Sequence, residues 1–243
     1  MKLAGVDLAW LCNKNPTAIA IGDLAAGVLT VSSVEVSVLP VEQIRDKLLS
    51  VAGLAGIAVD ASLIIPNQMG QRGCEKEISK HYGAKGASCH ASNLTLYPEP
   101  ASVEMSLMFA DHGFGHLGKS KWQLECYPHP AIIEIFALSY RLAYKKGRVA
   151  DKKAGQKQLA SLIKSLSNSP ILPLHIDTDI CKCFEESYLD SLCGKALKSN
   201  EDALDAVVCL YIAGLYAIDA PGRVFGNVDD GYIWVPQGSA LPN

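Results

Sequence analysis

The sequence predicts an α/β fold in which a mixed central sheet, three antiparallel strands followed by parallel strands, is flanked by helices. Three apolar runs, at 2–9, 17–22 and 28–38, lie close together with turn residues between them, which is typical of an antiparallel meander. The later apolar runs alternate with segments of helical periodicity, which favours parallel pairing for the strands that follow.

The remaining elements follow in order. Behind Pro40, apolar residues recur at helical spacing and predict a helix over 41–51. An apolar strand then ends at Asp60, and a shorter one is expected at 122–128. Further helices are predicted at 131–142, 154–167, 179–198 and 201–218, and a terminal hairpin at 222–236 turning at Asp229–Gly231.

We interpret the chain as one domain over residues 1–243, because its length suffices for a full core and no linker or repeat divides it. Residues 61–120 are the exception to its regularity. Gly, Pro, Asn and His are scattered there around two short helical patterns, near 74–82 and 102–109. We therefore expect an irregular insertion or lid.

Composition narrows the class of protein. Hydrophobic residues make up 49% and charged residues 19% of the chain, and no apolar run is long enough to span a bilayer. Asp7 interrupts the apolar start and no cleavage pattern follows, so we expect no signal peptide, a cytoplasmic location and reduced cysteines. The net charge of −3 argues against a protein that binds long nucleic acid through an overall positive charge.

Carboxylates carry the strongest chemical signal. Asp7 and Asp60 each end an apolar strand, and Asp202 and Asp205 lie three apart on one helix face. Asp205 sits in an apolar stretch, where an unpaired charge is costly. Such oxygen ligands suit one or two Mg²⁺ or Mn²⁺ ions, and Glu125 is a candidate further ligand or supporting group.

Each acid also has an explanation without metal. A strand-end Asp can cap a turn, and Glu125 can orient the turn that follows it. Glu201 and Asp202 are expected in the first turn of a helix, where acids complement the helix dipole.

Basic residues offer candidates for substrate binding. Residues 141–164 hold eight basic residues and one acid, among them Lys145, Lys152 and Lys153. They could meet phosphates, although such a run also suits a solvated face. Arg72 could clamp a phosphate or cap a helix, and His129 could shuttle protons near Glu125 or mark a rigid exposed turn between prolines.

Six segments together resemble a known family: GVDLAW, AVDASLIIP followed by QRGCE, ECYPHPA, YKKGRVADKKAGQ, EDALDAVVCLYIA and GYIWVP. The chain resembles the predicted nuclease family called domain of unknown function 429, over nearly its whole length. The resemblance implies a ribonuclease-H-like fold and metal-dependent phosphodiester hydrolysis by an acidic cluster. Asp7 and Asp60 match its first- and fourth-strand acids, Asp205 and its companion Asp202 the terminal-helix acids, and Glu125 the Glu-x-Tyr-Pro segment.

One position departs from the family pattern. The family usually has Asp-Ala-Pro-Leu after the fourth strand, and this chain has Ser62 in place of the proline. We expect this loop to lose the rigidity that a fixed proline φ supplies.

The sequence thus predicts a metal-dependent nuclease, a hydrolase acting on nucleic acid or a nucleotide and not on membranes. Two alternatives stay open. One is an ATP-binding enzyme of the actin-like and sugar-kinase type, although Leu8, Ala9 and Trp10 follow Asp7 where that fold normally places Gly and Thr or Ser. The other is a non-catalytic ribonuclease-H-like protein that binds without cutting.

Overall fold

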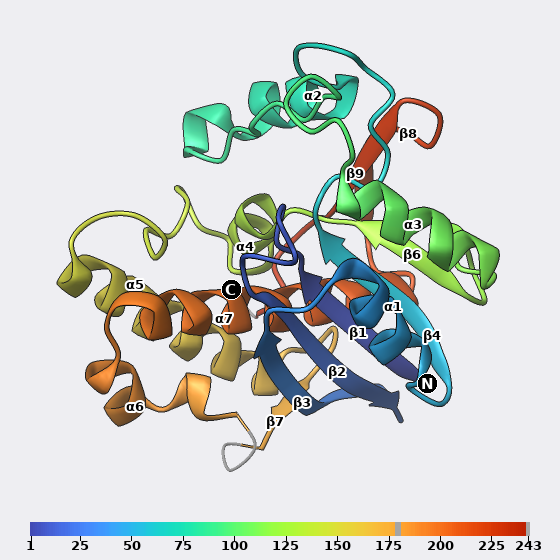
Figure 1. Ribbon diagram of the computed structural model, residues 1–243. Helices are drawn as coiled ribbons and strands as arrows, with labels where there is room; N and C mark the ends of the chain where they lie inside the picture. The colour runs from blue at the N-terminus through green and yellow to red at the C-terminus, as the bar shows by residue number, and fades with distance from the viewer. Residues whose placement is uncertain (178–180, 242–243) are drawn as a thin grey trace.

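A seven-stranded mixed sheet forms the centre of the computed structural model, which describes residues 1–177 and 181–241 (Figure 1). The strand order is β5-β6-β4-β1-β2-β3-β7. β1, β2 and β3 are antiparallel, and the other neighbours pair in parallel. The strands are β1 Lys2–Asp7, β2 Thr17–Ala25, β3 Val28–Ser37, β4 Leu54–Asp60, β5 Gly115–His116, β6 Trp122–Glu125 and β7 Leu174–Ile176. The predicted mixed α/β architecture is confirmed.

Helices cover both faces of this sheet. They are α1 Val41–Leu49, α2 Gly73–Tyr82, α3 Ala101–Asp111, α4 Pro128–Ile135, α5 Val149–Ser165, α6 Glu186–Ser191 and α7 Gly194–Ala217. One face carries α7, which crosses β1 to β4 and is backed by α4 and α5. The opposite face carries α1 and α3 (Figure 1).

The alternation of side chains along β1 decides which residues meet which layer. Leu3 belongs to the core cluster that contains α7, whereas Ala4 and Val6 belong to the cluster with α1 and α3. Because successive strand residues point to opposite faces, Gly5 and Asp7 share the α7 side with Leu3.

Gly5 allows α7 to lie directly against β1. A Cβ atom at this position would lie 2.0 Å from the Leu210 backbone nitrogen and 2.3 Å from the Ala206 carbonyl oxygen. Such distances are far below any contact that a methyl group accepts, so only glycine permits this helix–strand spacing.

Residues 61–120 are more regular than predicted. Besides α2 and α3, they contain the short strand β5 and a 3₁₀ turn at Gly83–Lys85. α2 packs on the hairpin formed by β8 Gly222–Asn227 and β9 Gly231–Pro236, and α3 packs on α1. The predicted terminal hairpin is confirmed, and it turns between Asn227 and Gly231.

The limits of several helices differ from those predicted. α4 ends at Ile135 and not at 142, because Ala137 takes a positive φ of 50° that a helix cannot contain. α5 spans Val149–Ser165. In place of a helix at 179–198, the described residues form a 3₁₀ turn at Lys182–Phe184 and the short α6, while 178–180 lie outside the described residues.

The last helix begins at Gly194, seven residues before the predicted start at 201. The strand β7 was not predicted, because its three residues beside β3 are too few to show a periodicity.

Among the described residues, no helix combines the length and apolar character needed to cross a membrane.

We expect Gly5→Ala to lower the free energy of unfolding by about 1–3 kcal/mol or more, because the added methyl group overlaps the α7 backbone. Urea denaturation would measure the loss. Gly73→Ala is the matched control, since a Cβ there meets no atom of the described residues within 4 Å, and it should change stability by less than about 1 kcal/mol. Equal stability of the two variants would contradict the close packing at Gly5.

Candidate active site

Asp7 and Asp60 lie side by side where β1 and β4 end. The strands are parallel neighbours, and Asp7 is the register partner of Asp60. Neighbouring strands are about 4.8 Å apart, so the two carboxyl groups start from adjacent backbone positions. Ala58 belongs to the core cluster that contains α7, and Asp60, two residues further along β4, faces the same side.

α7 brings Asp202 and Asp205 to the same edge. Gly5 contacts Ala206 on α7, and Asp202 lies four residues earlier on the helix. Four residues along a helix span about 6 Å, and the two residues from Gly5 to Asp7 span roughly 6.6 Å along a strand. Because the two lengths are similar, Asp202 lies near the level of Asp7. Because α7 begins at Gly194, Asp202 lies two turns inside the helix. The prediction that Glu201 and Asp202 complement the helix dipole from its first turn is therefore wrong.

Asp205 is fully buried and has two partners from the loop before α5. The Tyr144 hydroxyl donates a hydrogen bond to its Oδ1 at 2.6 Å. The Lys145 ammonium lies 2.7 Å from its Oδ2, and this ion pair is not aligned as a hydrogen bond. The buried charge that the sequence places in an apolar helix thus has a cation beside it.

A second glycine holds that loop in place. A Cβ atom at Gly155 of α5 would lie 2.0 Å from the Ala143 carbonyl oxygen and 2.7 Å from the Tyr144 Cα. The loop backbone therefore rests on α5 at the residues just before Lys145, and this contact sets where the ammonium group reaches Asp205.

Asp202 is paired with a different lysine. Lys198, one turn earlier on α7, donates to Asp202 Oδ1 at 2.6 Å and to Glu201 Oε1 at 2.8 Å. The side chain of Lys198 is 58% exposed, whereas that of Asp202 is 6% exposed. The partner of Asp202 is therefore a cation that is largely exposed to solvent, and the same cation also serves the buried Glu201.

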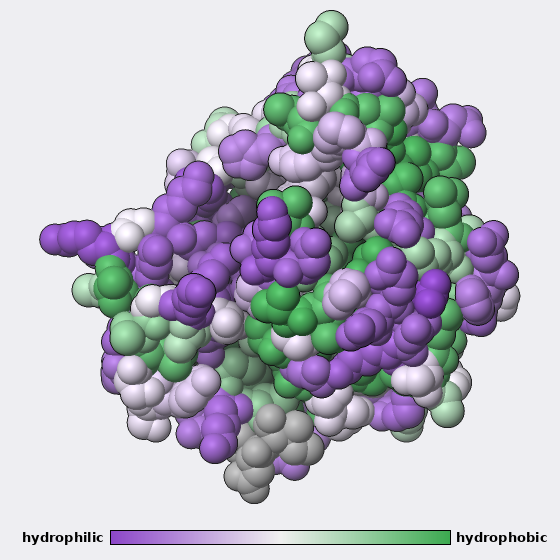
Figure 2. Space-filling view, viewed as in Figure 1, coloured by the Kyte–Doolittle hydropathy of each residue, from purple (hydrophilic) through white to green (hydrophobic). Residues whose placement is uncertain are grey.

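A cavity of about 600 Å³ opens above these residues. Asp7, Asp60 and Asp202 line it, and the fully buried Asp205 lies behind it. Its lining also carries cationic side chains, namely Arg72, Arg141, Lys145, Lys146 and Lys198. Figure 2 shows a hollowed, hydrophilic part of the surface between α2 and α5.

Burial and mutual repulsion shift the acids toward their neutral forms. The pKa of Asp7 is raised well above its usual value, first by burial and then by Asp205. Burial raises the pKa of Asp60 to about 7, against the lowering effect of Lys145. Burial also raises the pKa of Asp202, while hydrogen bonds with Lys198 and Asp7 oppose the rise. Two lysines do not fully compensate four carboxyl groups here.

Glu125 and Arg72 form a buried ion pair. Arg72 Nη2 lies 2.6 Å from Glu125 Oε1, and Arg72 Nη1 donates to Oε2 at 3.0 Å. Arg72 also donates to Glu75, Ser62 and the Ile64 carbonyl oxygen, so its guanidinium group is fully engaged within the protein. In this structure it holds a loop and the start of α2, and its donors are not directed at a substrate phosphate.

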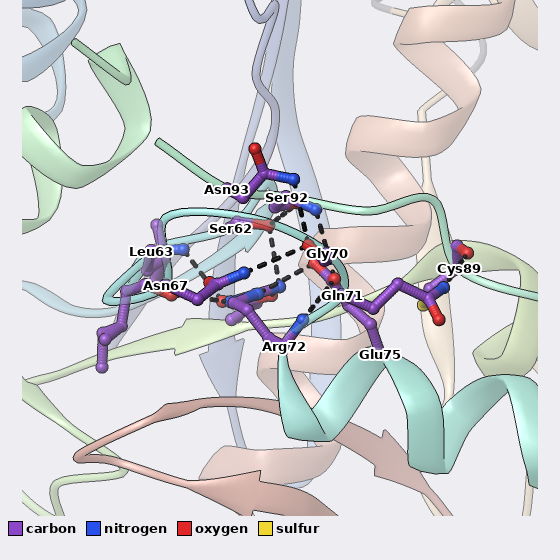
Figure 3. A network of polar contacts seen from close by, with 12 residues as sticks. Ser62, Leu63, Asn67, Gly70, Gln71, Arg72, Glu75, Cys89, Ser92 and Asn93 are labelled. Carbon is purple, nitrogen blue, oxygen red and sulfur yellow. Dashed lines mark hydrogen bonds and ion pairs between the residues drawn. The ribbon is translucent and has the colours of Figure 1, made fainter. Parts of the chain in front are cut away.

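Figure 3 shows how this network fixes the loop after β4. The Ser62 hydroxyl accepts from Arg72 at 2.7 Å and donates to Ser92 at 2.8 Å. The Ser102 hydroxyl donates to the Ser62 carbonyl oxygen at 2.6 Å, and the Leu63 amide donates to Glu125 at 2.8 Å. The loop is thus held by buried hydrogen bonds, and the expected loss of rigidity at Ser62 is not observed.

His129 lines the cavity but is only 7% exposed, so the expected exposed turn is not observed. Its ring packs against Tyr144 with the ring centroids 5.4 Å apart, and its buried Nδ1 has no hydrogen-bond partner among the described residues. Burial lowers the pKa of His129 to about 3, helped by Lys145. The imidazole is therefore neutral at physiological pH.

The other predicted lysines lie elsewhere. Lys152 and Lys153 are on α5 and do not line the cavity, and Lys153 donates to the Asp190 carbonyl oxygen. Sequence reasoning missed Tyr144 and Lys198. Lys198 had a signal, since it lies four residues before Asp202 on the same helix face.

In the part of the chain that the structure describes, no group of three or more His, Cys, Asp or Glu side chains is arranged to hold a metal ion. The donor types are those that a hard cation prefers, because Asp7, Asp60 and Asp202 supply only oxygen atoms. Lys145 and Lys198 supply the positive charge beside them.

We expect Arg72→Ala to lower the free energy of unfolding by roughly 3–5 kcal/mol, because it leaves Glu75 and Glu125 buried without a counter-charge. Urea denaturation would measure it. Arg148→Ala is the matched control: Arg148 pairs with Asp151 at the same helix-start spacing, but its side chain is 88% exposed, and the cost should be about 0–1 kcal/mol. A small loss in Arg72→Ala would show that the ion pair does not hold the loop.

His129 should make the protein sensitive to acid. Since its folded pKa lies below the unfolded value near 6.5, the unfolded chain binds the proton first, and stability falls as the pH drops from 6.5 toward 3. From pH 7.5 to 5.0 this amounts to about 2 kcal/mol. His129→Gln should lose correspondingly less stability over that interval, while His112→Gln, at an exposed position, should behave as the unmodified protein does. If stability changed equally with pH in the unmodified protein, His129→Gln and His112→Gln, the lowered pKa of His129 would be refuted.

Comparisons with known proteins place the chain in a family without assigning an activity. No curated protein and no solved structure matches it. A family model matches residues 5–230, which include all four aspartates of the site and Glu125. The chain belongs to the family described as protein of unknown function (DUF429).

Proposed function

We propose that this protein is a Mg²⁺- or Mn²⁺-dependent nuclease that hydrolyses phosphodiester bonds at the cavity lined by Asp7, Asp60 and Asp202. One observation carries the proposal. Four aspartates from three separate segments converge at one end of the sheet, where burial and repulsion raise the pKa values of Asp7, Asp60 and Asp202. A site that collects acids at such a cost is typical of function.

The topology supports a ribonuclease-H-like fold. The three antiparallel strands at the start, the parallel β4 and β6 beside β1, and the terminal helix packed across β1 match what the family resemblance implies. Fold alone does not assign an activity, so the proposal depends on the acids themselves.

The residues fit a hard divalent cation in donor type and charge. Asp7, Asp60 and Asp202 would hold it, with Asp205 as a fourth acid if Lys145 moves aside. The cation would supply a nucleophilic water at neutral pH and stabilise the attacking and leaving oxygens. The bound cation would replace Lys198 as the counter-charge of Asp202, and the exposed Lys198 could then turn toward solvent.

The cationic side chains of the protein have a role separate from that of the metal ion. Arg141 and Lys146 line the cavity and can attract the phosphate of a substrate. Lys145 forms an ion pair with Asp205 and lowers the pKa of Asp60. His129 is a poor proton shuttle in this state, because a pKa of about 3 is far from working pH.

We expect Asp7→Asn and Asp205→Asn to reduce cleavage of nucleic acid at least about 100-fold, which corresponds to about 2.7 kcal/mol in the barrier. The assay compares single-stranded, duplex and branched DNA and RNA with Mg²⁺, Mn²⁺ or EDTA. Asp219→Asn is the control, because Asp219 is exposed and pairs with exposed Lys119. Cleavage that survives EDTA, or full activity of Asp7→Asn, would refute the proposal.

A non-catalytic binding protein is the second candidate, favoured by one observation. Asp202 and Asp205 already have lysine partners, so part of the acidic cluster is compensated without any cation. Unchanged nucleic-acid affinity in Asp205→Asn, with no turnover by either form, would support this alternative.

A further inference from the structure

Trp10 is an exposed aromatic side chain beside the acids. It lies in the turn between β1 and β2, three residues after Asp7, and it lines the cavity. Its exposed fraction is 40%, whereas Trp122 and Trp234 are 2% and 4% exposed. Three residues of chain reach at most about 10–11 Å, so the backbone of Trp10 lies within that distance of Asp7, and both side chains line the same cavity.

Tyr97 supports the indole from below. The two rings are stacked with centroids 4.0 Å apart and an interplanar angle of 19°. Tyr97 belongs to a loop that buried Asn93 anchors: the Tyr97 amide donates to the Asn93 carbonyl oxygen at 2.9 Å, and Asn93 Nδ2 donates to the Gly70 carbonyl oxygen at 3.0 Å. Two loops far apart in the sequence thus build a flat aromatic surface that we call the Trp10–Tyr97 platform.

The turn that carries Trp10 is also ordered by its own hydrogen bonds. The Ala9 amide donates to the Thr17 hydroxyl at 3.2 Å, and the amides of Lys14 and Asn15 both donate to the Leu11 carbonyl oxygen at 2.9 Å. A preformed surface loses little conformational entropy when a planar ligand settles on it.

The cavity lining therefore combines two chemistries. Trp10 is the aromatic residue of this lining, and Tyr97, which stacks on Trp10, is not itself a lining residue. Exposed Leu11 and Leu96 adjoin these two residues in sequence. Arg141, Lys146 and Lys198 supply positive charge. A ligand that matches both needs a flat apolar ring joined to a phosphate, as in a nucleotide unit.

We propose that the Trp10–Tyr97 platform stacks an unpaired nucleobase, so that the site takes single-stranded nucleic acid in preference to duplex. This inference rests on the proposed function for the choice of ligand. In a duplex both faces of a base are covered by its neighbours, whereas an unpaired base can leave its face to an aromatic side chain. Stacking tolerates any base, so little sequence preference is expected.

Tryptophan fluorescence tests the proposal without relying on cleavage, because Trp10 is the exposed one of the three tryptophans. An eight-residue oligothymidylate is titrated at low salt with Ca²⁺ in place of Mg²⁺. We expect quenching in the unmodified protein. Because the variants lack this reporter, their binding is measured by the fluorescence anisotropy of a dye-labelled oligothymidylate, and we expect Trp10→Ala to weaken it roughly 5- to 100-fold while Trp10→Phe restores most of it. Tyr188→Ala, an exposed aromatic on α6 that does not line the cavity, should bind as the unmodified protein does.

Two further probes separate base from backbone. An abasic oligonucleotide of equal length and charge should bind equally to the unmodified protein and to Trp10→Ala. The oligothymidylate in duplex with oligoadenylate should quench less than the single strand. Thymidine monophosphate that quenches as strongly as the oligonucleotide would identify a free nucleotide as the source of the base and would overturn the single-strand preference.

The outcomes remain distinct from those of the nuclease assay. Quenching by the single strand without any cleavage would refute the nuclease and retain the platform. Cleavage with no quenching, or equal weakening of oligothymidylate and abasic binding in Trp10→Ala, would refute the platform and retain the nuclease. Absence of quenching by every probe overturns the inference.

Discussion

The contact between α7 and β1 is the constraint on which the rest of the structure depends. Helix and strand backbones touch at Gly5, so the helix has little freedom to slide along or lift from the strand. Every side chain of α7 is then fixed relative to the end of the strand. Asp202 and Asp205 reach Asp7 because of that fixed spacing, and the core cluster of α4, α5 and α7 is built on the same contact. Gly5, two residues before Asp7, thus allows α7 to bring its acids to the candidate site because it has no Cβ atom.

Bringing four carboxyl groups together costs free energy, and the protein places counter-charges beside some of these groups and not beside others. Asp205, with no exposure, has a tyrosine and a lysine whose loop is pressed onto α5 at Gly155. Asp202 pairs with the exposed Lys198, and Asp7 and Asp60 keep raised pKa values. The uncompensated part faces the cavity, where a bound cation would be most stabilised.

A second charge network, in which Arg72 pairs with two buried glutamates, makes the surroundings rigid. Arg72 joins Glu75 and Glu125 and so ties the loop after β4 and the start of α2 to the end of β6 (Figure 3). Breaking such a buried pair is costly, so this wall of the cavity is held in one arrangement. Beside it, the Trp10–Tyr97 platform is anchored through Asn93 to Gly70 in the loop that the network holds. Rigid walls around a charged centre suit a site that positions an extended ligand.

The sequence by itself determined the mixed sheet, the strand-end positions of Asp7 and Asp60 and the helix that carries Asp202 and Asp205, because hydrophobic periodicity and residue spacing are local properties. Helix limits were less certain: α7 begins at Gly194, where polar residues hide the first two turns, and α4 stops where Ala137 turns left-handed. Only the tertiary structure decided the partners. Arg72 and Glu125 are 53 residues apart, and Tyr144 and Asp205 are 61 apart. Their pairing depends on how the layers pack, and no local pattern in the sequence records that packing. The same packing decided that Lys145 reaches the acids while Lys152 and Lys153 do not.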